Sequence, residues 1–217
     1  MTPYRHARPR YIVVEGPIGV GKTTLVRRLS ERYRAHTVLE VFEENPFLAP
    51  FYEAPERFAF QTEMFFLLSR YRQQESFAQG DLFTEMHVSD YLFVKSRLFA
   101  SLTLSEHELA LYDRMYTILT EQVPQPDVVI HLHAPLETLL ARIGERGRPY
   151  ERQLDPEYLE RLRTLYHNFF AHYDATPLIE VDTSETDFSE NDSAVDELMK
   201  EVHRTWSASL RRPEVRF

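Results

Sequence analysis

The chain has 217 residues, 43% of them hydrophobic, which is enough for one sizeable core and predicts a single domain. A formal net charge of -9 argues against a nucleic-acid partner, because such a partner needs a net basic face. The chain has no cysteine, so disulfides and thiolate metal sites are excluded, and no apolar stretch reaches the roughly 18 residues of a membrane span. We therefore expect a soluble cytoplasmic protein that binds neither nucleic acid nor a membrane.

The apolar pattern and the turn residues divide the chain into alternating strands and helices. We interpret residues 1–9 as a mobile tail, 10–210 as the domain and 211–217 as a C-terminal tail. Strands are predicted at 10–15, 37–42, 82–89, 128–132 and 178–181, with a turn at 80–81. Helices are predicted at 22–35, 55–79, 91–101, 106–122, 135–146, 155–173 and 194–209. Ser105 and Glu108 form a capping box that starts the helix at 106.

Residues 11–29 join an apolar strand, a glycine loop and a helix. Gly16, Gly21, Lys22 and Thr23 fit the pattern G-x-x-x-x-G-K-[ST] of the phosphate-binding P-loop. Lys22 would reach the β- and γ-phosphates, and the hydroxyl of Thr23 would bind Mg²⁺. A plain glycine turn is the alternative, but the flanking strand and helix favour a nucleoside-triphosphate site. Its expected residues are Gly16, Pro17, Ile18, Gly19, Val20, Gly21, Lys22, Thr23 and Thr24.

Five strands that alternate with helices, opened by a P-loop, predict an α/β fold with a parallel sheet of about five strands flanked by helices. Ligands of such sheets bind outside the carboxyl ends of the strands. These ends are expected at 15–16, 40–42, 89–91 and 132–134. The phosphate acceptor is expected between the second and the third.

An arginine cluster follows the central strand and its helix. Four arginines lie between positions 142 and 152, in a lid that we place at about 144–154. Such a cluster can be a solvated face, but guanidinium groups suit phosphate oxygens, and phosphoryl transfer depends on such charges. The guanine-reading Asn-Lys-x-Asp of GTPases is absent. A kinase lid is therefore the favoured reading.

The chain resembles the deoxyribonucleoside kinase family, and within it the bacterial deoxyguanosine and deoxyadenosine kinases, most closely the deoxyguanosine kinases. The matching blocks extend over roughly 10–182. They are Glu15–Thr24, Glu44–Leu48, Phe51–Phe58, Phe65–Arg70, Ser89–Tyr91, Arg142–Arg148 and Pro156–Leu159.

The resemblance implies roles for single residues. Glu40 takes the place of the general base, with Glu43 and Glu44 as rivals because the motif departs from the family's Glu-Pro-Val. Tyr52 matches the tyrosine on the sugar 3′-hydroxyl, and Glu151 matches the glutamate that pairs with it. Phe99 either stacks on the base or belongs to the core. Arg142, Arg146 and Arg148 match the lid arginines.

One departure concerns the third strand. Relatives often have an arginine after its acidic residue, contacting the 5′ end of the substrate, whereas this chain has Ser89, Asp90 and Tyr91. Asp90 would hold Mg²⁺ through water. Arg97 or a lid arginine would supply the missing charge.

A second departure concerns the base. Glu63 stands where many relatives have glutamine, and Lys95 where relatives that read adenine or cytosine have aspartate. Guanine presents two donors, N1–H and N2–H₂, beside the O6 acceptor. Glu63 would accept from both donors, while Lys95 and Arg70 would donate toward O6 and N7. A simple salt bridge between Glu63 and Lys95 is the alternative.

These observations predict an enzyme that phosphorylates the 5′-hydroxyl of 2′-deoxyguanosine, with ATP or another nucleoside triphosphate as donor and Mg²⁺ as cofactor. The alternatives are a deoxyadenosine or deoxycytidine kinase, a thymidylate-type monophosphate kinase, and a nucleotide-dependent binding protein without an acceptor. The resemblance and the apolar helices at 55–79 and 106–122 suggest a homodimer.

Overall fold

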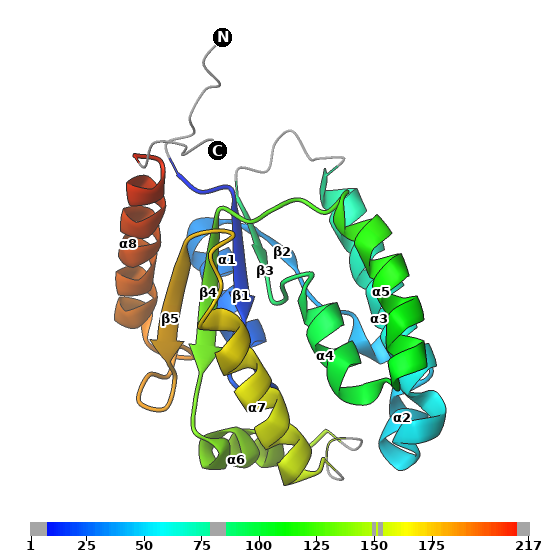
Figure 1. Cartoon of the computed structure of the whole chain (residues 1–217). Coiled ribbons are helices and arrows are strands. Elements are labelled where there is room, and N and C mark those ends of the chain that lie inside the picture. The colour runs from blue at the N-terminus through cyan, green and yellow to red at the C-terminus, as the bar shows by residue number, and fades with distance from the viewer. Residues whose placement is uncertain (1–7, 79–85, 149–150, 152–153, 212–217) are drawn as a thin grey trace.

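The computed structural model describes residues 8–78, 86–148, 151 and 154–211. The strands are β1 (Tyr11–Glu15), β2 (His36–Val38), β3 (His87–Ser89), β4 (Val128–His133) and β5 (Leu178–Asp182). The helices are α1 (Lys22–Tyr33), α2 (Leu48–Glu53), α3 (Pro55–Ala78), α4 (Lys95–Thr103), α5 (Glu106–Thr120), α6 (Leu136–Arg146), α7 (Pro156–Phe170) and α8 (Asp192–Ser209), with a 3₁₀ turn, η1, at Phe42–Glu44. Figure 1 shows their arrangement.

The strands form one parallel sheet in the order β2-β3-β1-β4-β5. Helices α1 and α8 contact one another and strands of the sheet, and α7 packs beside α4 in front of it in the view of Figure 1. Helices α3 and α5 pack beyond α4. The predicted α/β fold with a five-stranded parallel sheet is confirmed.

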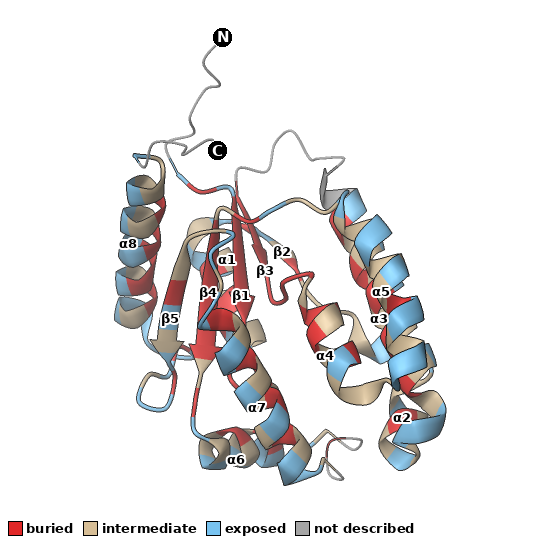
Figure 2. Cartoon of the chain, in the orientation of Figure 1, coloured by how far each residue is buried: buried red, intermediate tan, exposed pale blue. Residues whose placement is uncertain are grey.

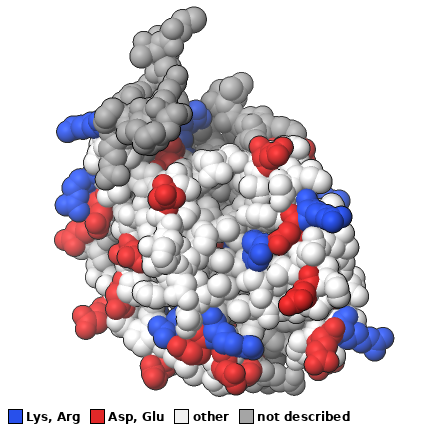
Figure 3. Space-filling model, viewed as in Figure 1, with Lys and Arg blue, Asp and Glu red and all other residues white. Residues whose placement is uncertain are grey.

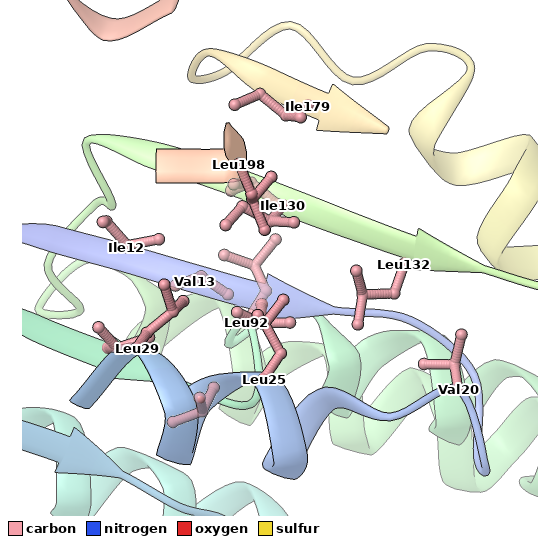
Figure 4. Packing of buried hydrophobic residues seen from close by; sticks show 14 of the residues in the cluster. Ile12, Val13, Val20, Leu25, Leu29, Leu92, Ile130, Leu132, Ile179 and Leu198 are labelled. Carbon is pink, nitrogen blue, oxygen red and sulfur yellow. The ribbon is translucent and has the colours of Figure 1, made fainter. Parts of the chain in front are cut away.

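The core is built on the central strands, because covered parallel strands are buried on both faces. Strand β1 is buried along its whole length, and Val14, Ile130 and Ile179 are paired in one row across β1, β4 and β5. Helix α8 contributes Leu198 to the same cluster, and α1 contributes Leu25 (Figure 4). The outer faces of the helices carry the exposed residues (Figure 2).

The second strand is shorter than predicted. We expected residues 37–42, but β2 ends at Val38 and the backbone N–H of Glu40 donates to Asp90 Oδ1 at 2.8 Å. The chain therefore leaves the sheet edge two residues before Glu40. Helix α2 was not predicted; it contains Pro50 in its first turn, where proline is tolerated.

The fourth helix begins later than predicted. We expected it at 91, but it starts at Lys95, because Glu15 Oε2 accepts the N–H of Leu92 at 2.7 Å and residues 91–94 form a turn. The capping box of Ser105 and Glu108 is confirmed. The predicted turn at 80–81, the start of the strand predicted at 82–89, and most of both tails lie outside the described residues.

The surface in the view of Figure 3 carries acidic and basic side chains intermingled, with uncharged areas between them. Among the described residues, no helix combines the length and the apolarity that spanning a bilayer requires.

The P-loop connects β1 to α1, and its first glycine leaves no room for a side chain. Gly16 has a φ of 151°, and an added Cβ would lie 2.2 Å from the backbone oxygen of Leu132 in β4. The neighbouring strand cannot move away without disturbing the central sheet. Gly144, in α6, has nothing within 4 Å of the same position.

We predict that Gly16→Ala lowers the free energy of unfolding by about 1–3 kcal/mol, because the loop must shift away from β4. Gly144→Ala is the matched control and should leave stability unchanged or raise it by about 0.5–1 kcal/mol, since alanine favours a helix. Urea unfolding followed by circular dichroism measures both. Equal effects of the two variants would show that the contact with Leu132 is not limiting.

Candidate active site

The P-loop has the backbone shape of an anion cradle. Gly16, Gly19 and Gly21 have positive φ angles, and Gly21 leads directly into α1. Lys22 Nζ donates to the carbonyl oxygens of Gly16, at 2.8 Å, and Pro17, at 3.0 Å. Burial, and then the positive charge of Lys95, lower the pKa of Lys22 to about 8. The loop thus places a lysine beside the N-terminus of a helix, where a phosphate binds favourably.

Three strand ends meet at the carboxylate of Asp90. Thr23 Oγ1, in the first turn of α1, donates to Asp90 Oδ2 at 2.7 Å. Asp90 Oδ1 accepts the backbone N–H of Glu40, and the N–H of Asp90 donates to Val38 O at 3.2 Å. The hydroxyl and the carboxylate predicted to lie near Mg²⁺ are therefore adjacent, and the same carboxylate holds Glu40 in place.

Glu40 lies between two basic side chains. Arg70 of α3 donates from Nε, at 2.9 Å, and from Nη2 to Glu40 Oε1, and Lys95 Nζ of α4 lies 2.6 Å from Oε2. Burial by itself would raise the pKa of Glu40, but the charges of Arg70 and Lys95 hold it well below its usual range. The carboxylate therefore stays ionised at neutral pH. Its rivals Glu43 and Glu44 are exposed on η1 and do not line the pocket.

Lys95 does not take the position that the sequence predicted. It was expected opposite the base beside Glu63, either as a reader of guanine or as the partner of Glu63, and it contacts Glu40 instead. The reason is that α4 starts at Lys95, next to the strand ends. Arg97, one of the two expected sources of the missing charge, pairs with Asp113 of α5 and is not part of the pocket.

Glu63 lies at the other end of the pocket. Its side chain is 3% exposed, and Thr103 Oγ1 donates to Oε1 at 3.1 Å. Among the described residues this is its one side-chain hydrogen bond, so Oε2 faces the cavity without a protein partner. Burial raises the pKa of Glu63 to about 7, although the positive charge of Arg70 opposes this. A pKa of about 7 places the change of charge of Glu63 near neutral pH.

The lid arginines divide into two groups. Arg146 donates to both oxygens of Glu151, at 2.7 and 2.8 Å, and Arg148 Nη1 approaches Glu151 Oε1 at 3.4 Å. Arg148 also lies 4.0 Å from the ring centre of Phe42. Arg142 is separate, because it donates to the backbone oxygen of Thr183 at 2.6 Å. The structure thus brings two of the three arginines to the pocket.

One pocket collects most of the predicted site residues. Tyr52 and Phe99 line it together with Lys22, Glu40 and Glu63. The other predicted residues that line it are Ile18, Gly19, Thr23, Arg70, Asp90, Lys95, Arg146, Arg148 and Glu151. The remaining loop residues Gly16, Pro17, Val20, Gly21 and Thr24, with Arg142, lie outside its lining.

Several residues of the site were not predicted. Glu15 is fully buried and accepts from the N–H of Gly16 at 2.8 Å, from that of Leu92 and from the hydroxyl of Tyr166 at 3.0 Å. In the sequence, the one feature that indicated a role for Glu15 was its charge next to the glycine loop. No sequence feature indicated a role for Ser96, Thr103 or Tyr158, because their positions in the site depend on packing between helices.

The comparisons with known proteins agree with this geometry. The family model for deoxynucleoside kinases matches residues 12–207. A deoxyguanosine kinase of Bacillus subtilis (strain 168) is 43% identical over 157 residues, which covers 72% of this chain and 76% of the relative. A deoxyadenosine/deoxycytidine kinase of the same organism is 29% identical over 196 residues, covering 88% of this chain and 90% of the relative.

A solved structure has the same fold. The deoxyadenosine kinase from M. mycoides with bound dCTP superimposes with a TM-score of 0.78 and 23% identity, over 89% of this chain and 99% of that one. The family model covers most of the chain. The chain therefore belongs to the deoxynucleoside kinase family.

Proposed function

We propose that this deoxynucleoside kinase phosphorylates the 5′-hydroxyl of 2′-deoxyguanosine for nucleotide salvage, with ATP or another nucleoside triphosphate as donor. The observation that carries the choice of base is Glu63, a buried carboxylate with one oxygen open to the pocket. An ionised carboxylate accepts from both N1–H and N2–H₂ of guanine, whereas adenine offers one donor and one acceptor on that edge. Guanine is therefore the complementary base.

Arg70 is the residue that we assign to O6 and N7 of the base. A guanidinium has five N–H groups, and the contacts of Arg70 with Glu40 and Ser96 use three of them among the described residues. Its positive charge also acts on Glu63. The same side chain thus connects the base end of the pocket to Glu40.

The names of the relatives support a deoxynucleoside as substrate and differ in the base. The relative at 43% identity bears the name deoxyguanosine kinase, which favours guanine. The relative at 29% identity bears the name deoxyadenosine/deoxycytidine kinase, so these two bases form the competing proposal.

The remaining roles follow from position in the pocket. We assign Glu40 as the acceptor of the 5′-hydroxyl proton, since it is the ionised carboxylate at the strand ends. Lys22, Arg146 and Arg148 would bind the donor phosphates, and Arg142, which approaches Val20 O at 3.5 Å, would hold the P-loop. For the acceptor, Tyr52 and Glu151 are assigned to the sugar and Phe99 to the base.

Thr23 and Asp90 fit Mg²⁺. Their oxygens are hard ligands 2.7 Å apart, beside the P-loop. The described residues contain no cluster of three or more metal-ligating side chains. Mg²⁺ usually keeps several waters and takes other ligands from the nucleotide phosphates, so these two side chains would be enough to hold it. The ion would neutralise charge on the phosphates.

We also propose a homodimer formed through α3 and α5. These helices contact one another and expose Leu68, Leu111 and Ile118, with exposed fractions of 40%, 52% and 59%. Buried in an interface, such side chains would contribute hydrophobic stabilisation. Sedimentation equilibrium should give a dimer for the wild type and a monomer for Ile118→Glu. A wild-type monomer at micromolar concentration would exclude the dimer.

The choice of base is tested by assaying the four deoxynucleosides with the wild type and Glu63→Gln. We expect deoxyguanosine to have the highest kcat/KM in the wild type. In Glu63→Gln this value should fall about 5- to 150-fold, because an unpaired polar group at the base edge costs about 1–3 kcal/mol. Deoxyadenosine or deoxycytidine should gain relative to it. A wild-type preference for another base would refute the proposal.

The protonation of Glu63 predicts a pH-dependent specificity. Its pKa of about 7 lies above the usual glutamate value, so the side chain is protonated below pH 7 and ionised above it. A protonated carboxyl has one donor and one acceptor and suits adenine. The ratio of kcat/KM for deoxyguanosine to that for deoxyadenosine should therefore rise between pH 6 and pH 8. In Glu63→Gln the ratio should stay constant, which serves as the control.

A further inference from the structure

Lys95 is in an unfavourable place for a structural lysine. It is the first residue of α4, where the helix dipole repels a positive charge, and it is 6% exposed. Buried cations need a partner, and lysines are rarely buried without one. The partner of Lys95 is Glu40 Oε2, at 2.6 Å. Besides Glu40, the ammonium group lies 5.6 Å from the ring centre of Phe99, and its charge acts on the buried carboxylate of Glu15.

Glu40 already has a sufficient counterion in Arg70. Two nitrogens of Arg70 hold Oε1, while its Nη1 is fixed by Ser96 Oγ at 2.7 Å. Arg70 is therefore rigidly held and neutralises the carboxylate. Lys95 is a second cation on the same carboxylate, held by Oε2 alone.

The side chain of Lys95 lines the same pocket as residues of the P-loop. Lys95 and Lys22 line the same pocket, and the charge of Lys95 acts on Lys22 and on Glu15. Asp90, the acidic residue after β3, is occupied by Thr23 and by the N–H of Glu40. Lys95 is thus a cation that contacts Glu40 and shares a pocket with Lys22 of the P-loop.

We propose that Lys95 is a catalytic residue of phosphoryl transfer rather than a reader of the base. The 5′-oxygen attacks the γ-phosphorus and forms a new O–P bond, the bond from that phosphorus to the β,γ-bridging oxygen breaks, and the nucleoside diphosphate leaves. The hydroxyl proton passes to Glu40. The inference rests on the proposed role of Glu40 and on the kinase activity of the family. It does not depend on which nucleobase the enzyme prefers.

Charge balance explains why a lysine serves this step. When Glu40 takes up the proton it becomes neutral and no longer holds Lys95, while negative charge spreads over the phosphoryl oxygens. The ammonium group then pairs with those oxygens in the transition state. A single flexible lysine can change partners in this way, whereas Arg70 is fixed by Ser96. The stabilisation is larger in the transition state than in the ground state, which raises kcat.

The test compares Lys95→Gln and Lys95→Arg with Arg97→Gln as matched control, using deoxyguanosine and deoxyadenosine. Arg97 lies on the same helix and pairs with Asp113 outside the pocket. We expect kcat of Lys95→Gln to fall by about 100-fold or more, the scale for loss of one transition-state donor, with KM changed less than threefold. Lys95→Arg should retain at least ten times the kcat of Lys95→Gln. Arg97→Gln should stay within twofold of the wild type.

The ratio of kcat/KM for the two nucleosides separates this inference from the proposed choice of base. It should be the same in the wild type and in both Lys95 variants. A changed ratio with unchanged kcat would make Lys95 a reader of the base and overturn the inference. If thermal unfolding shows that Lys95→Gln is not folded, the ratio of kcat/KM for the two nucleosides is measured in Lys95→Arg instead, and that value decides. A wild type that prefers another base refutes the guanine proposal and leaves the test of kcat intact.

Discussion

The site depends on keeping the charge of Glu40 in a place that is shielded from water. Isolated burial of a carboxylate is costly, so the chain must bring counterions to it. Arg70 reaches Glu40 from α3, Lys95 reaches it from α4, and Asp90 fixes its backbone from the end of β3. Residues that lie 30, 50 and 55 positions after Glu40 in the sequence therefore converge on it.

The same principle organises the rest of the pocket. Arg146 and Arg148 share Glu151, and Lys22 is held by two carbonyl oxygens of its own loop. Each of these basic side chains thus has an oxygen partner before any phosphate arrives. Substrate binding becomes an exchange of oxygen partners, which requires little reorganisation. In the proposed function, these basic side chains would exchange protein oxygens for phosphate oxygens.

The parts predicted correctly from the sequence are those determined by short stretches of chain. The P-loop, its strand and the start of its helix lie within 19 consecutive residues, 11–29, and the capping box at Ser105 needs only four. The errors fall where distant residues decide. Strand β2 ends early because Asp90 takes the N–H of Glu40, and α4 starts late because Glu15 takes the N–H of Leu92. Both acceptors come from other strands.

The sequence by itself determined the fold class, the phosphate loop and which residue types are available for chemistry, because hydrophobic period and glycine spacing act locally. It also placed Glu40 and Glu63 in the site. Only the tertiary structure decided the partners: Lys95 lies against Glu40 and not Glu63, Arg97 points to α5, and Arg142 is bonded at the end of β5. The direction in which a long side chain points depends on where its helix begins and on which groups lie across the pocket. No local pattern contains that information.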